Sequence, residues 1–252
     1  MIRIFILSII CISAFHCKNS KDNASQLWVF THYGSSNDSN KIPATSFLWL
    51  AKDKNFTSDF GKFESGTWML QNDQLKLTSG GKTTSHNFRV SGKEMQLSPD
   101  NSTVINFEAK PLKENDAAAN PFSITNNQWR IKAIQKETDP QIITRLVNHC
   151  KFWEAWFTWA LKNKLANIDV RSTASPIKIY GNGFTLKPLK ELPRRWINVF
   201  YDEQDCIKAN AILEKIIRTK DITWVQTDHK FKMFISAFQQ LQVFLKEFGT
   251  SS

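Results

Sequence analysis

The sequence predicts two folded parts in succession: a small antiparallel β-barrel over residues 26–112, and then a mostly helical α+β domain over residues 124–252. Three observations predict this multi-domain arrangement. Up to residue 110 the apolar residues form short runs with the alternation of strands. Turn-forming Gly, Asn, Asp and Pro recur between these runs. After residue 123 the apolar spacing changes to that of amphipathic helices.

About eight short strands are expected in the first part, because short strands at this spacing are typical of an antiparallel barrel or sandwich. Turns are expected at residues 71–74, 80–81 and 91–92, where Asn, Asp and Gly tolerate the backbone conformations of hairpins. Large aromatic side chains are expected to fill most of the interior. The side chains expected inside are Trp28, Phe47, Trp49, Phe56 and Trp68.

A resemblance rests on an early strand with Trp28, a later Gly66-x-Trp68-x-Leu70, a polar turn with Leu75-x-Leu77, and a Met95-x-Leu97 strand. In these features residues 26–112 resemble the lipocalin-like domains of bacterial envelope lipoproteins. The resemblance implies an up-and-down barrel and, for some relatives, an apolar ligand. It transfers no ligand-binding residue to this chain.

Residues 113–123 are expected to be a linker, since they contain little to bury. A strand is predicted over residues 127–132. Thr138 and Pro140 then predict the start of a helix that continues to about residue 164. A hairpin over residues 177–186, a helix over residues 203–219 that begins after Asp202, and a final helix from about residue 228 complete the second part.

The N-terminus predicts export. Residues 1–17 combine an early positive charge with about a dozen apolar residues, a stretch shorter than the roughly 20 residues that a membrane-spanning helix needs. Cys17 then opens a polar tract, residues 18–25, and the segment resembles a bacterial lipoprotein signal. That resemblance implies an acylated Cys17, a polar tether and an outer-membrane anchor facing the periplasm or the cell surface. His16 stands where such signals have a small residue, so secretion after cleavage near Cys17 is the alternative.

The charge is unevenly distributed. Residues 1–120 carry 13 Lys and Arg against 11 Asp and Glu, whereas residues 121–252 carry 20 against 12. A basic second half favours solubility or attraction to an anionic lipid or an acidic partner. Nucleic acid is not expected as a partner, because no DNA- or RNA-binding signature is present.

No catalytic or cofactor-binding motif is found in the sequence. It has no nucleophile elbow, phosphate loop or dinucleotide fingerprint, and no histidine spacing suited to a metal. Neither a metal nor another cofactor is therefore expected. A hydrolase is considered third, after the two functions given in the next paragraph. It would need a cleft where His149, Glu154 or Asp205 meets another polar group. Cys150 and Cys206 are candidates for a disulfide, with burial as free thiols as the alternative.

Two clusters are candidate ligand or partner surfaces: Trp153, Trp156 and Trp159 on the first long helix, and Arg194, Arg195 and Trp196 before the next. Dense tryptophans can line an apolar pocket, and Arg beside Trp suits phosphate headgroups. Core packing and a solvated loop are the alternatives. The expected function is a non-enzymatic interaction or scaffold protein tethered to a membrane. This function predicts no cavity above about 300 Å³, and a larger apolar cavity would count against it. Carriage of a lipid or small hydrophobic molecule, at the barrel mouth or beside Trp156, is second.

Overall fold

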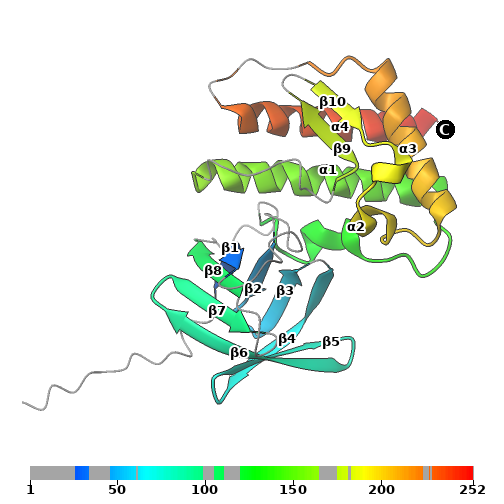
Figure 1. The fold of residues 1–252 in the computed structure, drawn as a ribbon. Helices are drawn as coiled ribbons and strands as arrows, with labels where there is room; N and C mark the ends of the chain where they lie inside the picture. Colours follow the sequence, from blue (N-terminus) through cyan, green and yellow to red (C-terminus); the bar gives the residue numbers. More distant parts are fainter. Residues whose placement is uncertain are drawn as a thin grey trace, which may run out of the picture.

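The structure is a computed structural model that describes residues 26–33, 46–60, 62–98, 105–110, 120–164, 175–180, 183–223, 227 and 229–251. It confirms an antiparallel barrel followed by a helical α+β part (Figure 1). The predicted signal, Cys17 and the tether lie outside the described residues, as does most of the predicted linker.

Eight strands form the barrel, each paired antiparallel with the next, and pairing of the first with the last closes it. The strands are β1 (Leu27–Tyr33), β2 (Phe47–Leu50), β3 (Asn55–Asp59), β4 (Phe63–Gln71), β5 (Gln74–Ser79), β6 (Lys82–Ser91), β7 (Glu94–Ser98) and β8 (Ile105–Lys110). The predicted hairpin turns are confirmed. Asn72, Asp73, Gly80, Gly81 and Gly92 all have positive φ, as turns between twisted strands require.

The barrel interior is filled by its own side chains. Successive residues of a strand point to opposite faces, and one of the two faces supplies a compact apolar cluster. Its buried members are Trp28, Leu48, Leu50, Phe56, Trp68, Leu75, Leu77, Phe88, Met95, Leu97 and Phe107. Phe47 and Trp49 are not among them. The prediction that these two lie inside is wrong, because both occupy outward positions of β2.

The helical part follows with η1 (Thr125–Arg130), α1 (Asp139–Lys162), a hairpin of β9 (Ile177–Tyr180) and β10 (Gly183–Leu186), η3 (Leu189–Glu191), α2 (Arg194–Ile197), α3 (Glu203–Thr219) and α4 (Lys230–Ser251). Thr138 caps α1, with Gln141 completing a capping box. Asp202 caps α3 by accepting a hydrogen bond from the Asp205 amide. The helix starts expected at these two caps are confirmed.

Helix α1 lies between the barrel and α4 (Figure 1) and is buried along most of its length. Its apolar residues join those of α3, α4 and the β9–β10 hairpin in one large cluster. Leu27 and Phe47 of the barrel belong to that same cluster. The outward faces of β1 and β2 are therefore part of the helical core.

The predicted strand over residues 127–132 is wrong. The chain there forms the short helix η1, because asparagine side chains satisfy nearby backbone groups in place of a strand partner. Asn127 Nδ2 donates to the carbonyls of Pro121 and Ser123, both at 2.8 Å. The described end of the predicted linker, residues 120–123, is buried, and Phe122 packs against Phe47 with ring centroids 4.8 Å apart.

Candidate functional site

The junction between the barrel and the helical part is built around a buried carboxylate. Asp59 is the last residue of β3, on the outward face, and its side chain is only 2% exposed. It forms ion pairs with Arg130 at the end of η1 and with Arg195 of α2, whose Nη1 lies 2.9 Å from Asp59 Oδ1. Three segments distant in the sequence therefore converge on one carboxyl group.

Aromatic rings surround the Arg130 guanidinium. Its central carbon lies 4.4 Å from the ring centroid of Phe152 and 4.9 Å from that of Trp129. Burial lowers the pKa of Arg130, and the charge of Asp59 opposes that change. Arginine remains protonated in proteins even so, so Arg130 contributes a full, largely desolvated positive charge.

Arg145 of α1 holds η1 in place. Its Nη1 donates to the carbonyls of Trp129, at 2.6 Å, and Ile131, at 2.9 Å. Its Nε and Nη2 bind the carboxylate of Glu137 at 2.9 Å. This arrangement fixes the backbone on both sides of Arg130, and therefore the direction in which Arg130 reaches toward the barrel.

Three donor atoms at this junction have no hydrogen-bond partner in the described part of the chain: Trp129 Nε1, Arg130 Nε and Arg195 Nη2. Buried donors without partners cost about 1–3 kcal/mol each. Two guanidinium groups also share the single carboxylate of Asp59. The junction therefore has an excess of positive charge and of donors.

A hollow of about 640 Å³ lies at this junction, partly open to solvent. Phe63, Trp129, Ile131 and Val199 form its apolar wall, and four cationic side chains and two carboxylates lie around it. The charged residues are Lys62, Arg130, Lys132, Arg195, Asp59 and Glu64. A second hollow, of about 860 Å³, lies against β4–β7 and is lined mostly by polar side chains. The expected limit of about 300 Å³ is therefore wrong.

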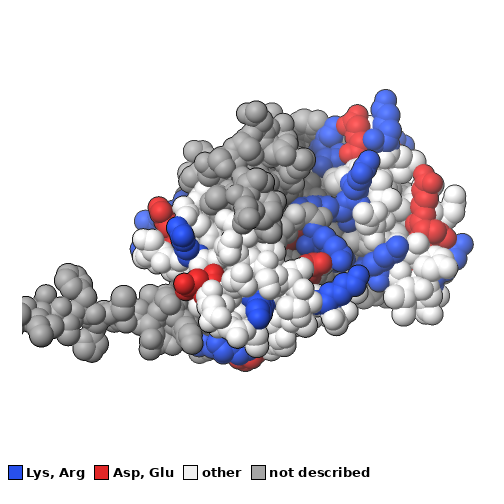
Figure 2. All heavy atoms as spheres, turned by 60° about the horizontal axis from the view of Figure 1, so that its bottom comes forward, with Lys and Arg blue, Asp and Glu red and all other residues white. Residues whose placement is uncertain are grey.

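An exposed apolar patch lies beside the junction hollow. Ile131 is 44% exposed, Ile134 93% and Tyr201 49%. The amide of Ala133 donates to the carbonyl of Val199 at 2.9 Å, which holds these two segments side by side. Lys and Arg predominate over Asp and Glu on the helical part of the face shown in Figure 2. Sequence reasoning missed this patch, since nothing in residues 131–134 distinguishes it from a loop.

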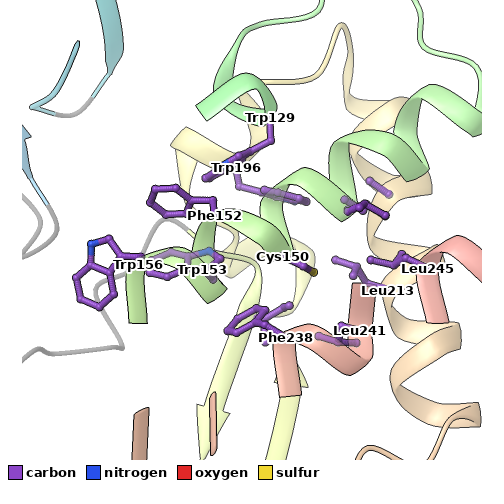
Figure 3. Packing of buried hydrophobic residues seen from close by; sticks show 14 of the residues in the cluster. Trp129, Cys150, Phe152, Trp153, Trp156, Trp196, Leu213, Phe238, Leu241 and Leu245 are labelled. Atoms are coloured by element: carbon purple, nitrogen blue, oxygen red, sulfur yellow. The ribbon is translucent and has the colours of Figure 1, made fainter. Parts of the chain in front are cut away.

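The tryptophans predicted as a candidate surface are instead core residues: Trp153, Trp156, Trp159 and Trp196 are all buried. Figure 3 shows three of them, Trp153, Trp156 and Trp196, among other buried side chains. Trp153 packs between His149 and Phe238, and Trp159 contacts Phe122 edge-on. The surface interpretation is wrong for these four residues. Of the two arginines beside Trp196, Arg194 is exposed, and only Arg195 reaches the junction.

The residues considered for a hydrolase do not converge. His149 is fully buried and accepts a hydrogen bond from Trp153 Nε1 at 2.9 Å. Glu154 accepts hydrogen bonds from Gln239 and Gln242. Asp205 accepts one from the Glu137 amide at 3.0 Å. None of His149, Glu154 and Asp205 lines either hollow.

Acid sensitivity is expected from His149. Burial, with a smaller contribution from the charge of Arg130, lowers the pKa of His149 to about 3. An unfolded histidine titrates near pH 6.5. Between these values only the unfolded chain binds this proton, so the free energy of unfolding should fall as the pH decreases through this range, by up to about 1.4 kcal/mol per pH unit.

Urea unfolding at pH 7, 5.5 and 4.5 measures this dependence. His149→Gln should remove this part of the slope, because glutamine can still accept from Trp153 but does not titrate. Equal slopes for both proteins would contradict the assignment.

Cys150 and Cys206 are free, buried thiols, so the candidate disulfide is absent from the structure. Burial raises the pKa of both thiols, that of Cys206 to about 11. A thiol with a raised pKa is a poor nucleophile. Both cysteines therefore act as small apolar residues of the helical core.

Neither a metal cluster nor a membrane span is found in the described residues. No three His, Cys, Asp or Glu side chains gather there in a way that could hold a metal ion. No described helix combines the length and apolar character needed to cross a membrane. Comparisons with protein-family models, with curated proteins and with solved structures found no match.

Proposed function

We propose that this chain is an exported, membrane-tethered protein of a bacterial cell envelope that acts as a non-enzymatic interaction or scaffold module. The observation that carries the proposal is that the two faces of the barrel make different contacts. The inner face is filled by its own side chains, and the outer face of β1 and β2 packs against the helical part. Strand β3 contacts the helical part through Thr57 and Asp59. The barrel thereby serves as a rigid support.

The patch of Ile131, Ile134 and Tyr201 is the surface that we assign to a partner. An isolated exposed apolar residue is common, but three on adjoining segments beside cationic side chains favour a binding role. A lipid on Cys17 would hold this surface near the membrane. The basic character of the second half suits an acidic protein partner or anionic lipid.

Site-specific photo-crosslinking in the membrane fraction of the native host tests the proposal. A photoreactive residue at position 201 should give an adduct of one defined mass, and the same residue at position 69 should not. Met69 is the matched control, since it is 54% exposed but lies on the barrel. The intact mass of the crosslinked chain should include a diacylglyceryl group on Cys17. Identical results at both positions, or a chain without the lipid in the soluble fraction, would contradict the proposal.

Carriage of a lipid or small hydrophobic molecule is the second candidate. The filled barrel and the burial of Trp156 argue against the two places first considered for it. The junction hollow favours it, because about 640 Å³ is within the usual range of small-molecule sites.

A further inference from the structure

We propose that the junction hollow binds a small anionic amphiphile, with its carboxylate or phosphate group against Arg195 and Arg130 and its apolar body against Phe63, Trp129 and Val199. This inference deepens the second candidate function and rests on it. It does not depend on the proposed protein partner.

The first support is the charge balance. Among the described residues, Asp59 compensates one of the two guanidinium groups that meet it, and no second carboxylate pairs with the other. Lys132 adds a further positive charge to the lining, while Glu64 is already paired with Lys62 at 3.1 Å. An anion in the hollow would neutralise the excess charge.

The second support is the unused hydrogen-bonding capacity. The side chain of Arg130 is 6% exposed, and its Nε has no partner in the described part of the chain; the same holds for Arg195 Nη2. A guanidinium binds carboxylate and phosphate through a planar fork of donors. An anion in the hollow would supply an acceptor for such donors.

The third support is the composition of the lining. Beside the charged groups and the polar Ser65, Ser79 and Asn198, the lining contains four apolar side chains, of which Phe63 and Ile131 are the more exposed. Small-molecule sites usually combine apolar walls with a few polar groups that fix orientation. A purely polar anion would leave these walls in contact with water, whereas an amphiphile would cover them.

Titration calorimetry with four probes of equal chain length tests the ligand class: dodecanoate, dodecyl phosphate, dodecanol and dodecyltrimethylammonium, each kept below its micelle concentration. The intact protein should bind the two anions at least about tenfold more tightly than the alcohol, since one charge-assisted hydrogen bond contributes that much. It should bind the cation most weakly. The two anionic probes show whether a carboxylate or a phosphate is preferred.

Variants locate the site. Arg195→Gln should weaken dodecanoate binding about tenfold or more, while Arg194→Gln should not change it. The two arginines are neighbours in α2, but Arg194 is exposed and does not line the hollow. Ser65→Trp supplies a second test that leaves the ion pairs intact. Ser65 is a partly exposed lining residue of β4, and a tryptophan there should block the ligand by occupying the hollow.

Three outcomes would overturn the inference. Equal affinity for dodecanol and dodecanoate would leave hydrophobic carriage standing and remove the anion preference. Dodecanoate binding that is unchanged in both Arg195→Gln and Ser65→Trp would place the ligand elsewhere. No binding of any probe would reject the anionic site together with the second candidate function.

Discussion

Asp59→Asn is expected to lower the free energy of unfolding by about 3 kcal/mol, because removing one partner of a buried ion pair leaves an uncompensated buried charge. Here the loss affects two guanidinium groups, Arg130 and Arg195, which both depend on the same carboxylate. Asparagine preserves the shape of the side chain, so the change isolates the charge. Equilibrium urea denaturation at pH 7 measures the effect.

Asp221→Asn is the matched control, since Asp221 is exposed. Surface substitutions of this kind usually change stability by less than about 0.5 kcal/mol. A similar, small effect for both variants would mean that the ion pairs do not hold the barrel to the helical part, and would contradict the junction described above.

Gly66→Ala is expected to destabilise the barrel by about 3 kcal/mol, near the upper end of the usual cost of overpacking. A Cβ atom on Gly66 would lie 1.9 Å from the carbonyl oxygen of Thr78 and 3.2 Å from Cε1 of Phe56. The first of these is backbone of the neighbouring strand β5, which cannot move without disturbing its pairing. Thermal unfolding followed by circular dichroism measures the loss.

Gly80→Ala is the control that separates the steric cost of an added Cβ from its conformational cost. Gly80 has a φ of +54°, but nothing lies within 4 Å of its added Cβ, so only the conformational cost of about 1–2 kcal/mol applies. If Gly66→Ala proved no more harmful than Gly80→Ala, the close approach of β4 and β5 would be incorrect.

Much of the fold could be predicted from local chemistry. Hairpin turns follow from Asn-Asp and Gly-Gly pairs, which adopt positive φ at low cost. The starts of α1 and α3 follow from Thr138 and Asp202, whose side chains can satisfy free backbone amides. These signals are contained within a few residues, so a single sequence is enough to find them.

The junction could not be predicted in the same way, because its residues come from segments far apart in the chain. Asp59 has no local feature that indicates two distant arginines. One signal was present, however. Phe47, Leu48, Trp49 and Leu50 are apolar at every position, and a strand without alternation is typical of burial on both faces. That pattern could have shown that β2 is covered from outside.

For the tryptophans, in contrast, the pattern is visible in the sequence but has two interpretations. Trp153, Trp156 and Trp159 are dense enough to line a pocket, but sequence alone cannot tell a pocket wall from a packed core. Helix α4 covers this part of α1, and the β9–β10 hairpin belongs to the same cluster. The candidate site lies instead where charged and apolar residues of different segments meet.

Hydrogen exchange at increasing urea concentration tests most directly the claim that the outer face of β1 and β2 and the helical part share one core. The slowest amides of β2, β3 and α1 should converge on the same free energy of opening and exchange together, as residues of one cooperative unit do. If the amides of β2 and β3 exchanged fully at a urea concentration where α1 remained protected, the two parts would unfold independently and the claim would be wrong.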